Sequence, residues 1–140
     1  ISQVELMLSY VNRFYKRQFI TRRNINNDIL LKAEALLDDY LDHDHSVIQG
    51  VPTVHFLSEQ LNVSAGYLSD MLRSLIGQST QQYIHHKLIE RAKEKLSTTQ
   101  LTVNEIAYEL GFEHAQSFSK LFKKKTAQTP LEFRGMFKSK

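Results

Sequence analysis

The chain has 140 residues and is 41% hydrophobic and 24% charged, which is typical of a globular protein with one or two small domains and argues against disorder. The absence of cysteine excludes a disulfide scaffold and a cysteine-based zinc site. No apolar run approaches the roughly 20 residues of a membrane span, so we expect no membrane partner. The absence of cysteine also fits a reducing cytoplasm, where we expect the protein to be. Because the first residue is Ile1, we also expect the chain to be part of a longer protein.

The net charge of +3 is unevenly distributed along the chain. Five basic residues and one acidic residue give residues 1–27 a charge of +4, and one basic and seven acidic residues give residues 28–62 a charge of −6. Twelve basic and seven acidic residues give residues 63–140 a charge of +5. This distribution indicates that the C-terminal half meets a polyanion and that the acidic stretch does not, with random clustering on a solvated surface as the alternative.

Two amphipathic helices are predicted in the first fifty residues. Apolar side chains recur at intervals of three and four residues from Val4 to Phe19, and again from Ile29 to Leu41. The polar segment 21–27 separates the two runs, and Asn27 is expected to cap the second helix. Residues 43–50 are expected to form a loop.

The rest of the chain contains one helical unit twice. The matched positions are 49 residues apart before a turn and 50 apart after it: Thr53 with Thr102, Leu57 with Ile106, Leu61 with Leu110, Leu68 with Phe118, and Leu72 with Phe122. A slip of one residue belongs in a turn between two helices, where Asn62 and Gly111 both tolerate a left-handed conformation. We therefore predict an all-α protein with helix-turn-helix units at about 53–77 and 102–125.

Capping residues mark where the helices of these units begin. Thr53 and Ser64 are expected to cap the two helices of the first unit, and Gly77 is expected to end the second of them. A capping box at Ser79 predicts the start of a linker helix over about 79–97, and a second capping box at Thr102 predicts the start of the second unit. Pro130 is expected to begin a final helix, with Phe118, Phe122, Phe133 and Phe137 in the core.

In a helix-turn-helix the second helix enters the major groove, so its non-core face is left for DNA. In the first unit this face carries Gly66, Ser69, Asp70 and Arg73. In the second unit it carries Gln116, Ser117, Lys120, Lys123 and Lys124. Gln and Lys can bind base edges and Ser either bases or phosphate, whereas Arg73, Lys123 and Lys124 lie further along and suit phosphates. His114, beside the second of these helices, is a further candidate for a phosphate contact.

Several strings in this half resemble the DNA-binding domain of AraC/XylS-type transcription regulators. They are Ile106-Ala107-Tyr108-Glu109-Leu110-Gly111-Phe112, Ser117-Phe118-Ser119-Lys120-Leu121-Phe122, and Thr129-Pro130-Leu131-Glu132-Phe133-Arg134. The resemblance covers residues 53–134. Residues 1–50 resemble the helical stretch that precedes this domain in a subgroup of these regulators, so we expect a linker region over 1–50 and the DNA-binding domain over 51–137.

The resemblance implies a sequence-specific activator with no cofactor, whose two recognition helices enter successive major grooves of double-stranded DNA. It also implies a sensor domain upstream, a homodimer of the full-length protein, and contact with RNA polymerase. Carried over by position, the base-facing residues are Gly66, Ser69, Asp70, Gln116, Ser117 and Lys120. Phosphate contacts are expected from Ser64, Arg73, Ser79, His114, Lys123 and Lys124.

The sequence departs from the family pattern in its first recognition helix. Asp70 stands where many members carry Arg or another polar residue, and Gly66 has no side chain to offer to a base. An acid near phosphates is repelled, although it can accept from a cytosine amino group. We therefore predict that the second unit supplies more of the specificity. Ala127 stands where the family usually has Gly, and we expect it to affect only a helix end.

Other classes of function have less support in the sequence. His43-Asp44-His45 could suggest a metal site, but no further ligand set is evident, and His85 and His86 point about 100° apart on a helix. No nucleophile-elbow motif or glycine-rich phosphate loop is present, so an enzyme is not expected. The remaining alternative is a protein–protein interaction module that has lost DNA binding, suggested by the weak first recognition helix and the acidic stretch.

Overall fold

The structure, a computed structural model, describes residues 24–43 and 45–138. Within these residues every regular element is a helix, which confirms the predicted all-α class. The amphipathic helix predicted between Val4 and Phe19 lies outside the described residues. In the part of the chain that is described, no helix is both long enough and apolar enough to cross a membrane.

The helix predicted to start after Asn27 is already helical at residue 24 and continues to residue 42. The prediction that Asn27 caps it is therefore wrong. Asn27 lies exposed within the helix, and the preceding Asn26 accepts a 2.7 Å hydrogen bond from the Tyr67 hydroxyl through Oδ1. That contact comes from a segment 41 residues away, so the local capping signal could not reveal it.

The segment predicted as a loop between residues 43 and 50 contains a short helix, α2, over His45–Gln49. The loop prediction is wrong because a distant partner organises this segment. Ser46 is completely buried, and its Oγ donates a 2.6 Å hydrogen bond to the carbonyl oxygen of Glu109. The helix ends at Gly50, whose φ is +90°.

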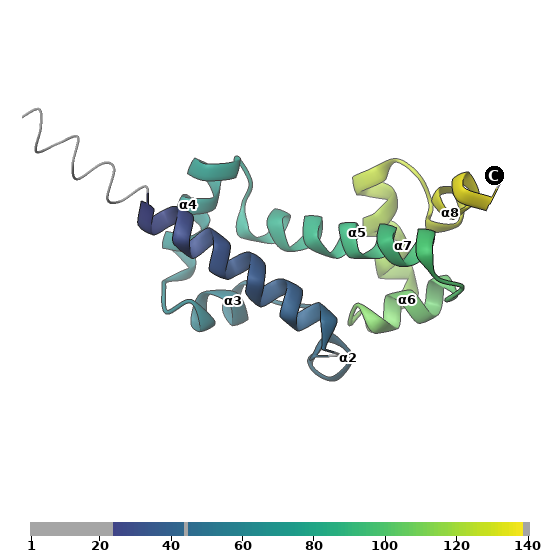
Figure 1. Ribbon diagram of the computed structural model, residues 1–140, viewed down its shortest axis with the longest axis horizontal. Coiled ribbons are helices and arrows are strands. Elements are labelled where there is room, and N and C mark those ends of the chain that lie inside the picture. Colours follow the sequence, from purple (N-terminus) through teal and green to yellow (C-terminus); the bar gives the residue numbers. More distant parts are fainter. Residues whose placement is uncertain (1–23, 44, 139–140) are drawn as a thin grey trace, which may run out of the picture.

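Two helix-turn-helix units follow, joined by one long helix. The first unit comprises α3 (Val54–Gln60) and α4 (Ala65–Ile76), and the second comprises α6 (Val103–Glu109) and α7 (Ala115–Thr126). The linker helix α5 (Thr80–Thr98) has 19 residues and is about 28 Å long at the usual rise per residue. In Figure 1 it lies along the molecule, with α3 and α4 at one end and α6 and α7 at the other.

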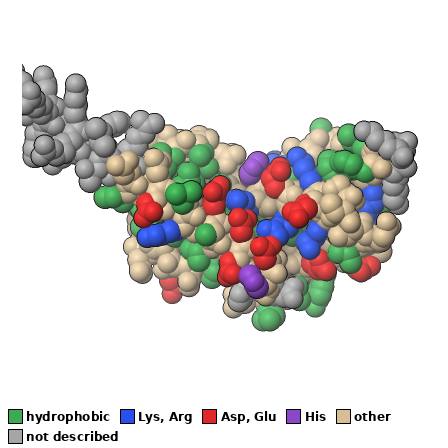
Figure 2. Space-filling model, viewed as in Figure 1, with side chains coloured by type: hydrophobic (Ala, Val, Ile, Leu, Met, Phe, Trp, Pro, Cys, Tyr) green, Lys and Arg blue, Asp and Glu red, His purple; other side chains and the backbone are tan. Residues whose placement is uncertain are grey.

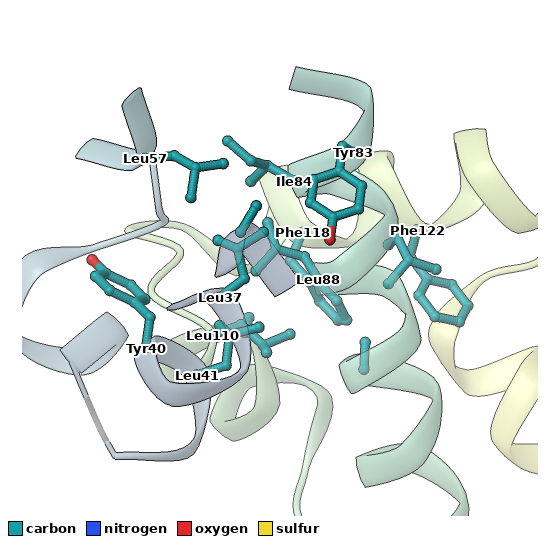
Figure 3. Close-up of a cluster of buried hydrophobic side chains, with 14 of the residues drawn as sticks. Leu37, Tyr40, Leu41, Leu57, Tyr83, Ile84, Leu88, Leu110, Phe118 and Phe122 are labelled. Atoms are coloured by element: carbon teal, nitrogen blue, oxygen red, sulfur yellow. The ribbon is translucent and has the colours of Figure 1, made fainter. Parts of the chain in front are cut away.

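The buried side chains of both units, the linker helix and the residue 24–42 helix form one hydrophobic cluster. Leu37 and Leu41 of the residue 24–42 helix belong to it together with Leu88 of α5 and Leu110 of the second unit (Figure 3). The two units therefore do not have independent cores. The residues of this cluster that are completely buried are Ala33, Leu37, Leu57, Leu68, Leu72, Ile84, Ala92, Ile106, Phe118 and Phe122.

The last helix, α8 (Pro130–Lys138), packs on the end of α5 through a buried arginine. Arg134 is 8% exposed, and its Nε and Nη2 donate to the carbonyl oxygens of Leu96 and Thr99 at 3.1 and 3.4 Å. These carbonyls lie at the C-terminal end of α5, where a cation is favoured and acceptors lack helical partners. Arg134 thereby fixes the position of α8.

Phe137 is not a core residue, contrary to the sequence prediction, because 49% of its surface is exposed. It lies in the last turn of α8, where its ring contacts that of Phe133 at a centroid distance of 5.2 Å. Phe133 in turn packs edge-on against Phe122. The aromatic series thus starts in the core and ends at the surface.

Candidate nucleic-acid interface

The first helix-turn-helix unit is held by local hydrogen bonds at each helix start. The Thr53 side chain accepts from the backbone N–H of Phe56, and the Ser64 side chain accepts from that of Tyr67, both at 3.0 Å. Asn62 in the turn has a φ of +56°, and Gly77 after α4 has a φ of +68°. The predicted caps, the left-handed turn residue and the helix end are all confirmed.

The second unit repeats this plan with a stronger cap. Thr102 and Glu105 form the predicted capping box, in which each side chain accepts from the other residue's backbone N–H. Gly111 takes the left-handed turn position with a φ of +95°, as predicted from its match with Asn62. The capping box predicted at Ser79 is also present, with Gln82 as its partner, and it starts α5.

The two recognition helices end in the same backbone conformation with different residues. Gly77 closes α4 at a φ of +68°, and Ala127 closes α7 at a φ of +64°. A left-handed conformation costs a residue with a Cβ roughly 1 kcal/mol, a cost that glycine does not have. The second unit therefore carries local strain that its counterpart lacks.

We expect Ala127→Gly to raise the free energy of unfolding by up to about 1 kcal/mol, because it removes this strain. Gly77→Ala is the matched reverse change, since an added Cβ there meets nothing within 4 Å and only the backbone conformation is penalised. It should lower the free energy of unfolding by a similar amount. Urea denaturation followed by circular dichroism measures both. Shifts of the same sign would contradict this explanation.

On the first recognition helix the predicted DNA-facing residues lie at or near the surface. Gly66, Asp70 and Arg73 are exposed, and Ser69 is half-buried. An added Cβ at Gly66 would meet no atom within 4 Å, so the backbone is open to a close approach. Ser64 is exposed but uses its hydroxyl as the cap of α4.

On the second recognition helix all the predicted residues are exposed: His114, Gln116, Ser117, Lys120, Lys123 and Lys124. His114 occupies the N-cap position but makes no side-chain cap bond, so its imidazole is not engaged by the start of α7. Lys125, which the sequence interpretation did not include, is also exposed and extends the basic series. The run of three lysines at residues 123–125 was the signal that could have revealed it.

The charges of the two recognition helices differ. Asp70 and Arg73 cancel in α4, whereas α7 carries four lysines and no acid, giving it a charge of +4. Three of these lysines lie in the last turn, where cations interact favourably with the helix dipole. The positive potential is therefore concentrated on the second unit.

His85 on α5 lies near the lysines at the end of α7 but adds no charge to them. Burial, and then Lys125 and Lys124, lower the pKa of His85, so the ring is neutral at pH 7. Gln81 Nε2 lies 2.8 Å from His85 Nε2, a geometry in which the neutral ring accepts a hydrogen bond from the amide. Protonation of His85 is thus disfavoured by the same lysines that provide the basic surface.

The remaining histidine motif forms local contacts. His43 Nδ1 lies 2.9 Å from Asp39 Oδ1, one helical turn earlier. Among the residues described, no group of three or more His, Asp or Glu side chains could hold a metal ion.

Comparison with known proteins places this architecture in a family. Residues 57–136, more than half of the chain, match the family model of a helix-turn-helix domain. An HTH-type transcriptional regulator of Staphylococcus aureus strain MSSA476 is 30% identical over 130 residues. The match covers 92% of this chain but only 16% of the regulator, so the chain spans about one sixth of that relative's length.

Solved structures share the fold. The C-terminal domain of the two-component response regulator YesN from Fusobacterium nucleatum is 37% identical, with a TM-score of 0.60, covering 74% of this chain and 98% of that domain. The DNA-binding domain of the transcriptional factor AdpA, solved with a target DNA, is 22% identical, with a TM-score of 0.66, covering 79% and 93% of the respective chains. The chain therefore belongs to the AraC-type helix-turn-helix family.

Proposed function

We propose that this domain binds double-stranded DNA by inserting α4 and α7 into successive major grooves on one face of the duplex, as the DNA-reading part of an activator. The observation that carries the proposal is the pair of capped helix-turn-helix units at the two ends of the 19-residue helix α5 (Figure 1). Successive major grooves are about 34 Å apart, which α5 together with the two units can span. The likeness in fold to the AdpA domain, which was solved with a target DNA, supports DNA as the partner.

The exposed face of each recognition helix supplies the proposed contacts. Gln116, Ser117 and Lys120 read bases in one groove, and Gly66, Ser69 and Asp70 face bases in the other. Ser64, Arg73, Ser79, His114, Lys123 and Lys124 contact phosphates. The backbone N–H groups at the starts of α4, α5 and α7 favour such anions, since helix N-termini carry partial positive charge.

We infer that the second unit reads most of the sequence and the first mainly positions the protein. The exposed amide and amine groups of α7 can form hydrogen bonds with bases, whereas α4 offers a glycine, a half-buried serine and an acid. The +4 charge of α7 also favours its approach to DNA, while α4 has no net charge.

Lys120→Ala is expected to relax base preference in one box and to lower affinity for the selected site roughly tenfold, because a good base contact is worth about 1–3 kcal/mol. Lys123→Ala is the matched control on the same helix: it should weaken binding to all sequences alike and reduce the salt slope by about one. Selection of bound sequences from random DNA measures the preference. If Lys120→Ala left the preferred base sequence unchanged while Ser69→Ala altered it, the first unit and not the second would supply most of the specificity.

The acidic stretch is the main argument for a protein–protein module instead, and the structure accounts for much of it within the molecule. Glu34, Asp38 and Asp42 pair with Lys87 and Arg91 of α5, and Asp28 pairs with Lys32. Salt-dependent DNA affinity separates the two functions, since neutralised phosphates make log affinity fall linearly with log salt concentration.

RNA polymerase is the proposed partner for the exposed apolar side chains where α2 meets α6. Ile48 and Tyr108 are 83% and 63% exposed and line one shallow depression with Glu105. Such contiguous apolar exposure is a feature of protein-binding surfaces. We also propose that the longer protein forms a homodimer. Because DNA is the proposed partner, we propose a cytoplasmic location.

A further inference from the structure

The segment made of residues 24–43 and 45–50 contacts both helix-turn-helix units rather than packing on one of them. In Figure 1 the residue 24–42 helix starts beside α4 and passes below the start of α5, and α2 lies between the units next to α6. At the first unit the Tyr67 hydroxyl donates to Asn26 Oδ1 at 2.7 Å, and the rings of Tyr40 and Phe56 pack at 5.0 Å. The segment is thus held to the first unit both near the start of the residue 24–42 helix, at Asn26, and near its end, at Tyr40.

The segment is also held to the linker helix by ion pairs. Lys87 Nζ lies 3.6 Å from Asp38 Oδ1, Arg91 Nη2 lies 3.6 Å from the same atom, and Arg91 Nη1 bonds Asp42. Figure 2 shows acidic and basic side chains interspersed at the centre of this face. The basic partners are about 20% exposed and the acids about half exposed, so these pairs fix the register of the helices more than they stabilise the fold.

The C-terminal end of the segment holds the turn of the second unit. Within that turn, the Phe112 N–H donates to the carbonyl of Ala107, and the Gly111 N–H donates to the carbonyl of Tyr108. The carbonyl of Glu109 accepts instead from the buried Ser46 hydroxyl. These are carbonyls of the last turn of α6, where helical partners run out. Four residues after Ser46, the backbone of Gly50 lies directly against Gly111, the left-handed residue of the same turn.

We propose that residues 24–43 and 45–50 form a strut that fixes the distance and angle between the two recognition helices, with Ser46 as the positioning residue at the second unit. The bonds and ring contacts of the strut named above involve none of the residues proposed to contact DNA, yet the strut determines which separation of half-sites the domain accepts. Without it, α5 and its core contacts alone would set the geometry. The inference rests on the proposed two-groove binding for its effect on DNA, but the fixed geometry is a property of the free protein.

The DNA test uses duplexes selected from random sequence by the unmodified chain, with one or two base pairs then inserted or removed between the half-sites. The unmodified chain should bind one spacing best. Removing the Ser46 hydroxyl leaves the Glu109 carbonyl unsatisfied. In Ser46→Ala, the ratio of affinities between the best spacing and the others should therefore fall about tenfold, while the affinity for an isolated half-site stays unchanged. Ser97→Ala is the control, because Ser97 Oγ donates only within α5, to the carbonyl of Glu94.

A second measurement needs no DNA. Because the chain has no cysteine, Gln60→Cys on α3 and Asn104→Cys on α6 provide two exposed sites for spin labels. Pulsed dipolar spectroscopy should give a narrow distance distribution in the parent protein, a broader one with Ser46→Ala, and an intermediate one with Asp38→Asn. The Asp38→Asn variant tests the strut through an exposed position, should Ser46→Ala impair folding.

An unchanged spacing profile and an unchanged distance distribution in both variants would overturn the strut. If the unmodified chain itself shows no preferred spacing, two-groove binding fails instead. The label distances then decide the strut alone, with broadening in the variants supporting it and no broadening overturning it.

Discussion

Gly111→Ala is expected to lower the free energy of unfolding by about 3 kcal/mol or more, the largest effect of any single methyl group added to this domain. A Cβ at this position would lie 2.5 Å from the carbonyl carbon of Gly50 and 2.7 Å from the backbone nitrogen of Val51. Both obstacles are backbone atoms, so no side-chain rotation relieves the clash. The φ of +95° adds a conformational penalty that glycine alone avoids.

Gly135→Ala is the control for this prediction. Gly135 lies within α8, and an added Cβ meets nothing within 4 Å, so this change should stabilise the domain by roughly 0.5–1 kcal/mol through helix propensity. Urea denaturation at constant temperature compares the two variants. Equal stability of Gly111→Ala and the parent protein would mean that the contact between Gly50 and Gly111 is absent in solution.

Leu37→Ala is expected to cost about 2–5 kcal/mol and to loosen both helix-turn-helix units at once. Leu37 is completely buried, and it shares its cluster with Leu57 of the first unit, Leu88 of α5 and Leu110 of the second. Figure 3 shows it among these side chains. A residue of the segment before the repeated units therefore contributes to the core that both units use.

Leu31→Ala is the matched control, since Leu31 lies on the same helix but is 64% exposed, and its truncation should change stability by less than about 0.5 kcal/mol. Hydrogen exchange distinguishes a shared core from a local one. In Leu37→Ala, amides of α4 and α7 should both exchange faster. Faster exchange confined to residues 24–42 would show that this helix unfolds separately.

The features that the sequence predicts well are local ones. The capping boxes at Ser79 and Thr102 and the left-handed turn residues each depend on neighbours a few positions away, and all take the predicted form. The exposed faces of α4 and α7 were also predictable, because the apolar periodicity that fills the core fixes which side remains outside. Which exposed residue meets a base and which a phosphate does not follow from periodicity, and so those roles remain proposals.

The predictions that fail concern contacts between distant segments. Helix α2 has only five residues and no apolar period, and its defining bond joins Ser46 to a carbonyl 63 positions later. Asn27 has the chemistry of a cap, but the helix begins earlier and its first described turn is held by Tyr67. Phe137 continues an aromatic series beyond the point where the core ends, which no property of phenylalanine reveals.

The pairing of Lys87 and Arg91 with the acids of the residue 24–42 helix also has a kinetic consequence. Cations that are already neutralised contribute little to the long-range field, so the centre of the molecule attracts a duplex only weakly. Of the two recognition helices, α7 with its four lysines then supplies the attraction at a distance, while α4 contributes no net charge. With the proposed two-groove binding, we expect α7 to meet DNA before α4 does.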